Sequence, residues 1–206
     1  MLLTIHPDNP QPRFIHTVVD TLKSGGVIIY PTDTIYGLGC DIYNTAAIER
    51  ICRIKNIVPK KSQFSFICSD LSHLADYARS VDTPIFRMLK AALPGPYTFI
   101  LEASKEVPKA LKVKKDTVGI RVPASNIAQE LVRALGHPIM SLSLPMPDDD
   151  VEIFTDPEII EQELGHLVDI VIDGGMGGIV PSTVIDCTTG IPSLIREGAG
   201  EWQSLL

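Results

Sequence analysis

The sequence predicts an α/β layer fold with a mixed sheet, formed as a single domain over residues 1–206. Segments with the apolar spacing of helices alternate with short apolar runs that are typical of strands. The chain has neither an internal repeat nor a Ser/Gly linker, and its 45% hydrophobic and 21% charged side chains are ordinary for one folded core. The segments follow no strict strand–helix–strand rhythm, which argues against a simple Rossmann or TIM-barrel arrangement.

Six segments predict helices because their apolar residues recur three or four positions apart. Capping signals support the starts of three of them: Asp8 or Asn9 for the first, Asn44 or Thr45 for the second and Asp156 for the last. The six helices are expected over residues 9–24, 44–55, 71–77, 83–93, 126–135 and 157–164.

Eight short apolar runs predict strands. The first, Val27–Tyr30, is continuously apolar and ends at Pro31, which is typical of a strand buried on both faces. The expected strands cover residues 27–30, 64–68, 97–101, 118–122, 139–143, 168–172, 183–186 and 193–196. Residues 147–150 are expected to form an exposed loop and not a domain boundary.

Charge is divided unevenly along the chain, whose net charge is −7. Residues 1–133 contain 17 basic and 12 acidic side chains, whereas residues 134–195 contain 11 acidic side chains and no Lys or Arg. This division argues against a uniformly basic coat for nucleic acid, but it allows a basic face on the first two thirds.

The first residues and the cysteines predict a cytoplasmic protein without a membrane span. The sequence MLLTIHPDNP lacks the basic region of a secretory signal, and no window of 18 residues is apolar and uncharged. The four cysteines form no C-x-x-C pair, so neither a zinc knuckle nor a disulfide framework is expected, and no metal site is predicted.

Residues 31–40, with the sequence PTDTIYGLGC, follow the buried strand at the place where α/β folds usually present their sites. Three small polar side chains, at residues 32–34, would project just past the strand. Gly37 and Gly39 would let the backbone come close to a ligand. A tight turn with local hydrogen bonds explains the same pattern equally well.

Five cations lie on or after the second expected helix, and they have two interpretations. They would form a cradle for phosphate or carboxylate, or they would be the solvated end of a helix, which is the commoner explanation of such a run. The five are Arg50, Arg53, Lys55, Lys60 and Lys61.

Two further segments contain glycines. Residues 173–178, with the sequence DGGMGG, would present backbone N–H groups to a phosphate or form a flexible hairpin loop. They lack the G-K-[ST] ending of a P-loop. Arg196 precedes a turn that Gly198 would permit.

Taken in order, these segments resemble the YrdC-like family, whose best-known members are threonylcarbamoyl-AMP synthases. The matching stretches are GGVIIYPTDTIYGLGCD (25–41), RICRIKN (50–56), LPGPYTFIL (93–101), VGIRVP (118–123), DIVIDGG (169–175), PSTVIDC (181–187) and IREG (195–198). The resemblance implies a twisted open sheet with flanking helices and a positively charged concave cavity.

The resemblance also implies a reaction of the nucleotidyltransferase type. Threonine, bicarbonate and ATP, the last as its Mg²⁺ complex, give threonylcarbamoyl-AMP and pyrophosphate for the modification of a tRNA adenosine. By position in the family motifs, the residues at the amino-acid substrate are Thr34, Arg121 and Ser182. The residues at the nucleotide are Lys55, Ser143 and Arg196.

Two positions depart from the family pattern. Ile57 stands where the K-x-R motif has its arginine, and Pro145 stands where the S-x-N motif has its asparagine. Hydrogen bonds to charged groups contribute about 1.5–3 kcal/mol each, so losing both predicts weakened synthesis. These departures resemble the YciO branch of the family.

Three functions therefore stay open. The protein is an enzyme or adenylate-binding protein of the synthase type, a double-stranded RNA or tRNA-binding protein without synthase activity, or a small-molecule sensor without turnover. The RNA hypothesis uses Lys60, Lys61 and the lysines of residues 109–115, and it predicts an affinity that falls steeply with salt.

Overall fold

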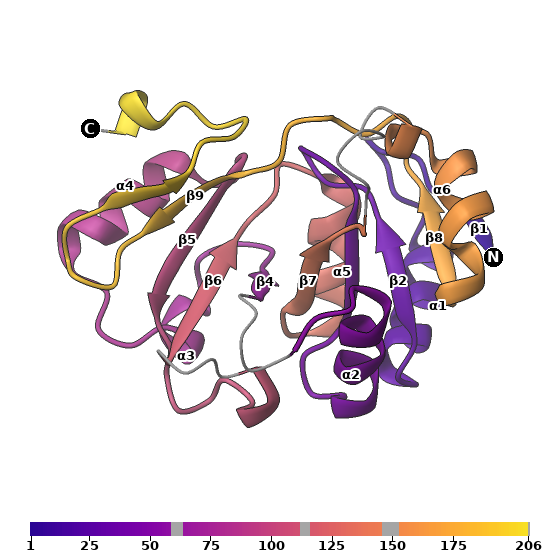
Figure 1. Ribbon diagram of the computed structural model, residues 1–206, viewed down its shortest axis with the longest axis horizontal. Coiled ribbons are helices and arrows are strands. Elements are labelled where there is room, and N and C mark those ends of the chain that lie inside the picture. The colour runs from indigo at the N-terminus through magenta and orange to yellow at the C-terminus, as the bar shows by residue number, and fades with distance from the viewer. Residues whose placement is uncertain (59–63, 112–115, 146–152, 206) are drawn as a thin grey trace.

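The computed structural model describes residues 1–58, 64–111, 116–145 and 153–205, and its strands form one ten-stranded sheet (Figure 1). The strands are β1 (Leu2–Thr4), β2 (Val27–Tyr30), β3 (Gly37–Asp41), β4 (Ser65–Ile67), β5 (Tyr97–Glu102), β6 (Thr117–Arg121), β7 (Ile139–Ser143), β8 (Ile170–Asp173), β9 (Thr183–Asp186) and β10 (Ser193–Arg196). Their order across the sheet is β1-β8-β2-β3-β7-β4-β6-β5-β9-β10. Parallel pairs such as β2–β8 and antiparallel pairs such as β2–β3 both occur, which confirms the predicted α/β class with a mixed open sheet.

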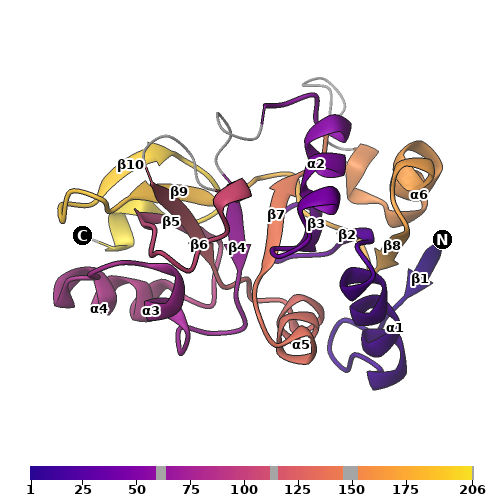
Figure 2. The same ribbon diagram turned by 90° about the horizontal axis from the view of Figure 1, so that it is seen from below.

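Helices cover both faces of the sheet. They are α1 (Pro12–Lys23), α2 (Thr45–Ile54), α3 (Leu74–Tyr77), α4 (Thr83–Ala92), α5 (Asn126–Leu135) and α6 (Pro157–Leu164). Figure 2 shows α1 and α5 on one side of the sheet and α2 on the other. Strand β2 is buried between them, because Val27 and Ile29 belong to the apolar cluster that includes α2, whereas Ile28 and Tyr30 belong to that of α1 and α5.

The sequence placed most of these elements well. Strands β2, β7, β9 and β10 and helices α5 and α6 have the expected bounds. The side chains of Asn44 and Asp156 cap α2 and α6 as expected. The expected cap of the first helix is wrong. Its N-cap is Gln11, because Pro12 suits the first helical position, and the backbone N–H groups of Asp8 and Asn9 bond to His6 Nδ1 instead.

Two strands were not expected, β1 and β3. Strand β1 has three residues and shows no alternation in the sequence. Strand β3 contains Gly37 and Gly39, a residue type that is depleted in strands, and the sequence therefore indicated a turn. It pairs with β7 over its full length and with β2 over residues 37–40, so the sheet supplies the stability that the local sequence lacks.

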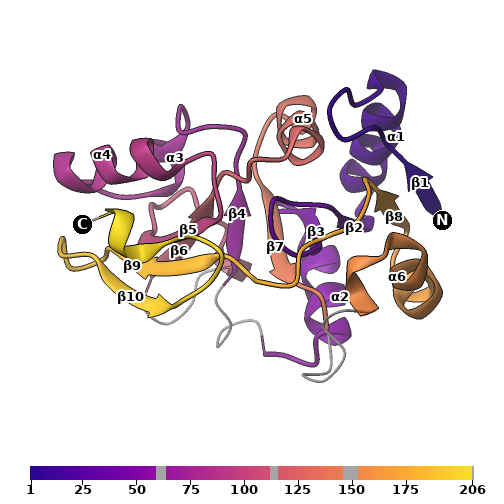
Figure 3. The same ribbon diagram turned by 90° about the horizontal axis from the view of Figure 1, so that it is seen from above.

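The glycine-rich segment after β8 connects the two halves of the sheet. Figure 3 shows it running from β8 across to β9, which lies beyond β5. The expected hairpin loop is therefore wrong, because β8 and β9 are not neighbours in the sheet. None of the helices in the described ranges is long and apolar enough to cross a membrane.

Candidate functional site

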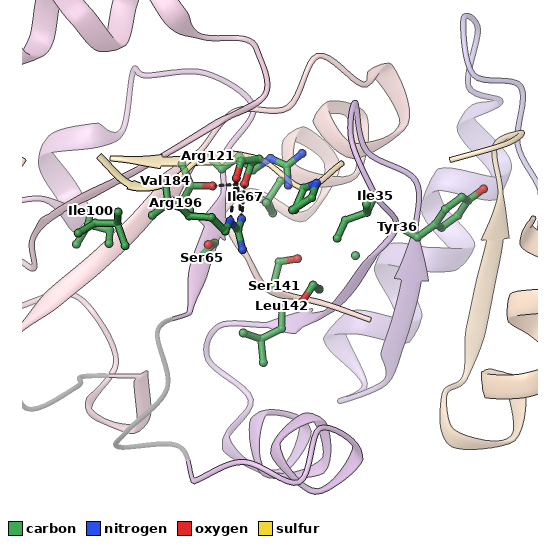
Figure 4. Close-up of a pocket in the computed structure, with 16 residues that line it drawn as sticks. Ile35, Tyr36, Ser65, Ile67, Ile100, Arg121, Ser141, Leu142, Val184 and Arg196 are labelled. Carbon is green, nitrogen blue, oxygen red and sulfur yellow. Dashed lines mark hydrogen bonds between the residues drawn. The ribbon is translucent and has the colours of Figure 1, made fainter. Parts of the chain in front are cut away.

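A cavity of about 270 Å³ lies on the sheet and receives residues from seven strands, β3, β4, β5, β6, β7, β9 and β10 (Figure 4). Several lining residues occupy alternate positions of one strand, as Ser141 and Ser143 do on β7. Because alternate side chains share a face of a sheet, β4, β5 and β7 each present two such side chains to the same cavity. The lining also includes aliphatic side chains, among them Ile35, Ile67 and Ile100.

Arg121, the last residue of β6, is 8% exposed and lines this cavity. Its Nη2 atom donates to Thr32 Oγ1 at 3.0 Å, Asp33 Oδ1 at 2.6 Å and Thr34 Oγ1 at 2.7 Å. Its Nε atom is buried and has no hydrogen-bond partner among the described residues. Arg121 is therefore held firmly from one side and keeps an unsatisfied donor.

The segment between β2 and β3 supplies the hydrogen-bond partners of Arg121. Thr32 donates to the Ile35 carbonyl and accepts from the Thr34 N–H, which is the local turn that the sequence offered as one interpretation. Asp33 uses its second oxygen to accept from the Ala124 N–H at 3.0 Å. Thr34 is 3% exposed and lies beside Arg121, not among the cavity-lining residues. Its contact with a substrate remains a prediction.

Arg196 brings a second guanidinium to the cavity from β10. Its Nε and Nη2 atoms both donate to the Ser182 carbonyl, at 3.2 and 2.7 Å, and Nη2 lies 3.3 Å from Ser182 Oγ. Burial lowers the pKa of Arg196, and the nearby charge of Arg121 lowers it further. Two like charges therefore share this space, and no Asp or Glu is found among the described residues that line it.

Gly198 makes the contact between Arg196 and Ser182 possible. A Cβ atom at this position would overlap the Pro181 carbonyl oxygen and lie 2.5 Å from the Ser182 carbonyl carbon. Its φ is not positive, so the glycine is needed for close approach of two backbones and not for the turn that the sequence indicated.

Hydroxyl groups also line the cavity. Thr98 Oγ1 and Ser182 Oγ are 2.9 Å apart and share a hydrogen bond. Ser141 Oγ accepts from the phenol of Tyr30 at 2.7 Å. Sequence reasoning did not select Thr98, Ser141 or Tyr30. The alternation Ser141-Leu142-Ser143 at the end of an apolar strand was the available signal for Ser141.

Gly37 and Gly39 leave room for the ring of Tyr30. A Cβ atom on Gly37 would lie 3.1 Å from the ring, and one on Gly39 would lie 2.9 Å from it. The expectation that both glycines let the backbone approach a ligand is therefore wrong for Gly39, which is not a lining residue. Gly37 does line the cavity.

Of the predicted nucleotide residues, Ser143 and Arg196 line the cavity and Lys55 does not. Lys55 Nζ donates to the Leu144 carbonyl at 2.8 Å, which ties the end of α2 to the end of β7. Burial lowers the pKa of Lys55. The amine therefore reaches the chain next to Ser143 without entering the cavity.

Ile57 completes the C-terminal cap of α2. Asn56 has a left-handed backbone with φ of 51°, its N–H donates to the Arg53 carbonyl, and the Ile57 N–H donates to the Cys52 carbonyl at 2.9 Å. This is the Schellman arrangement, in which an apolar residue commonly follows the left-handed position. The Ile57 side chain packs against the main apolar cluster, so it contributes to the core in place of a cation.

Arg50 and Lys55, two described members of the predicted cation cradle, bond to carbonyl groups of different segments. Arg50 donates to Asp169 at 2.6 Å and to the Leu167 carbonyl at 2.7 Å, and it does not line the cavity. Lys60 and Lys61 lie outside the described residues, as do Lys112, Lys114 and Lys115, and the RNA interface they were expected to form stays a prediction.

The glycine-rich connection does not offer its N–H groups to a phosphate. The Gly174 and Gly175 N–H groups bond to Tyr36 Oη and to Asp173 Oδ1. The Gly177 and Gly178 N–H groups bond to the carbonyls of Thr155 and Thr34. The bonds to Tyr36 and Thr34 tie the connection to residues 31–36. All four glycine N–H groups are therefore already paired, which argues against the phosphate interpretation of this segment.

Comparison with known proteins identifies relatives over nearly the whole chain. Residues 20–198 match the Sua5/YciO/YrdC family model, described as telomere recombination. The chain is 48% identical to the uncharacterized protein YciO of Escherichia coli (strain K12) over 205 residues, 98% of this chain and 97% of that protein. It is 31% identical to the threonylcarbamoyl-AMP synthase of Coxiella burnetii over 177 residues, 85% of this chain and 94% of that protein.

Solved structures give the same picture. The crystal structure of E. coli YciO superimposes with a TM-score of 0.92 at 47% identity, covering 100% of this chain and 99% of that one. The crystal structure of P. abyssi Sua5 complexed with L-threonine superimposes with a TM-score of 0.87 at 25% identity, covering 100% of this chain and 59% of that one.

Proposed function

This chain belongs to the Sua5/YciO/YrdC family, and we propose that its cavity binds L-threonine and ATP and forms threonylcarbamoyl-AMP at a reduced rate. A nucleotide-binding function related to that of the Sua5 and YrdC proteins follows from this membership. The named substrates and the reaction are our proposal for this chain.

Unpaired hydrogen-bond donors and two guanidinium groups in the cavity support the proposal. Arg121 keeps a buried Nε–H without a partner among the described residues. Thr98 and Ser182 share one hydrogen bond, so one of their two O–H groups has no partner in this pair. Arg196 Nη2 lies within hydrogen-bond distance of Ser182 Oγ and adds a further donor. An unsatisfied buried donor costs about 1–3 kcal/mol, so a ligand with several anionic oxygens would be stabilised here.

A carbamate and a nucleotide phosphate are ligands of that kind. In the proposed reaction threonine and bicarbonate give a carbamate and water. A carbamate oxygen then bonds to the α-phosphorus of ATP, and the bond from that phosphorus to pyrophosphate breaks. Arg121 and Arg196 would offset the repulsion between the two anions and hold them in position. Mg²⁺ enters as part of the ATP substrate, bound through the phosphates.

The size of the cavity fits the smaller substrate. At about 270 Å³ it is slightly below the range of about 300–1,000 Å³ that is usual for drug-sized ligands. Threonine would therefore lie inside, and the nucleotide would extend past the rim. Ile57 and Pro145 would leave the nucleotide with fewer polar partners than the family motifs provide, which is why we expect slow synthesis.

Incubation of the protein with ATP, Mg²⁺, L-threonine and bicarbonate tests the proposal. We expect pyrophosphate and threonylcarbamoyl-AMP, detected by mass spectrometry, and at least about a tenfold loss in Arg196→Gln because one charged contact is removed. Arg133→Gln is the matched control, since Arg133 lies on the exposed face of α5 in a pair with Glu130. Absence of product from the wild-type protein, together with no binding of threonine or ATP in calorimetry, would overturn the proposal.

A further inference from the structure

Tyr30 reaches across a neighbouring strand to touch the cavity wall. It belongs to β2, and the strand beside it is β3, so β7 is two strands away. The phenol nevertheless donates to Ser141 Oγ on β7 at 2.7 Å. The two glycines of β3 leave the space through which the ring passes. The side chain is fully buried, with 0% of its surface exposed.

This hydrogen bond occupies one lone pair of the Ser141 hydroxyl. A serine oxygen carries one proton and accepts through its lone pairs, and here it accepts from Tyr30. No acceptor for the Ser141 proton occurs among the described residues, and Ser141 lines the cavity. The proton is therefore left for an acceptor inside the cavity. Burial raises the pKa of Tyr30 to about 12, so the phenol stays protonated and remains the donor near neutral pH.

A purely apolar core does not require this arrangement. Phenylalanine would fill the same space over Gly37 and Gly39, whereas a buried phenol oxygen costs free energy unless it is hydrogen-bonded. In this protein the phenol oxygen is hydrogen-bonded to Ser141, a residue of the cavity wall. Figure 4 shows Ser141 on the wall formed by β7, with the two arginines on the opposite strands.

We propose that Tyr30 is a positioning residue, which turns the Ser141 O–H into the cavity as a hydrogen-bond donor for an anionic oxygen of the bound ligand. This inference rests on the proposed function, because it needs an anionic ligand in the cavity. It adds a specific contact on the β7 wall, distinct from the charges of Arg121 and Arg196.

A double-mutant cycle with L-threonine as the probe tests the inference. In calorimetry we expect Ser141→Ala to raise the dissociation constant about 3- to 10-fold and Tyr30→Phe to raise it about 2- to 5-fold. The double variant should match Ser141→Ala, because Tyr30 acts through Ser141. Tyr77→Phe is the control for loss of a buried phenol, since Tyr77 is 6% exposed and lies outside the cavity. It should leave the dissociation constant unchanged.

A second measurement needs no Tyr30 variant and covers the case in which Tyr30→Phe does not fold. In wild-type protein labelled with ¹³Cζ-tyrosine, saturation with L-threonine should shift the Tyr30 signal, because a bond donated by Ser141 strengthens the one it accepts. The Tyr77 signal should stay in place, and Ser141→Ala should abolish the Tyr30 shift.

The outcomes separate the two proposals. If the wild-type protein binds threonine and neither variant changes the dissociation constant, or the two effects are additive, the role of Tyr30 is overturned and the proposed function stands. An unshifted Tyr30 signal at saturation has the same meaning. If the wild-type protein binds no threonine at all, both proposals fall.

Discussion

At the scale of single residues, the candidate site depends on how Arg121 is kept charged inside the protein. Asp33 is the carboxylate that pairs with it, at 2.6 Å, and each side chain is only 10% exposed. The same carboxylate also accepts from the Ala124 N–H. A buried charge is tolerated only when it is paired and hydrogen-bonded, so Asp33 is as important for the cavity as the arginine itself.

Asp33→Asn should lower the free energy of unfolding by about 3 kcal/mol, because it leaves the buried guanidinium without its counter-charge. Urea unfolding at neutral pH measures this. Glu130→Gln is the control, since its pair with Arg133 is roughly half exposed, and it should cost under about 1 kcal/mol. Equal, small effects of the two substitutions would show that the Arg121 pair contributes little.

Tyr30 predicts a loss of stability at alkaline pH. Burial raises the pKa of its phenol from 10.0 to about 12, so above pH 10 the unfolded chain loses a proton that the folded protein keeps. The contribution of Tyr30 is therefore complete below pH 10 and is lost as the pH rises toward 12. Urea unfolding at pH 9, 10 and 11 should give a shallower decline for Tyr30→Phe than for the wild-type protein. Parallel declines would contradict this assignment.

The individual site residues show what the sequence can and cannot provide. Family motifs led to Arg121, Ser143, Ser182 and Arg196, all of which line the cavity. Tyr30 could not be identified in this way, because its contact with Ser141 depends on the strand order β2-β3-β7. A local sequence pattern does not reveal which strands will be neighbours in the sheet.

At the scale of secondary structure elements, local signals worked where they were complete. Helix α5 starts at a capping side chain, that of Ser125, and ends at Gly136 with φ of 87°, and its bounds were predicted correctly. Strand β3 was missed because its glycines argue for a turn, and only its partners on both sides make it a strand. The Schellman end of α2 explains Ile57, which from the sequence was only a missing cation.

Gly198, in the turn after β10, does not line the cavity, but we expect its substitution to affect ligand binding there. Gly198→Ala should force the Ser182 backbone away from Arg196, at a cost of about 1–3 kcal/mol, and should also weaken threonine binding. Gly165→Ala is the control, because Gly165 has a helical φ of −59° and faces only the flexible side chain of Glu161. Urea unfolding and calorimetry on both variants decide this. Unchanged affinity in a folded Gly198→Ala protein would show that the Ser182 contact is dispensable.

At the scale of the whole molecule, the net charge of −7 conceals a cavity lined by two arginines. Arg121 comes from the basic first two thirds, and Ser182 comes from the stretch that contains no Lys or Arg. The connection from β8 to β9 brings them together across the sheet (Figure 3). The net charge of the chain therefore does not indicate what the cavity would bind. The hydrogen-bond donors that line the cavity are the better guide to its ligand.

The central claim is that these donors select an anionic ligand, and one calorimetric comparison tests it most directly. L-threonine and L-threoninamide differ by replacement of the carboxylate with a neutral carboxamide. Because hydrogen bonds to charged groups contribute about 1.5–3 kcal/mol, threonine should bind the wild-type protein at least about tenfold more tightly. Equal dissociation constants for the two compounds, or binding of neither, would contradict the account.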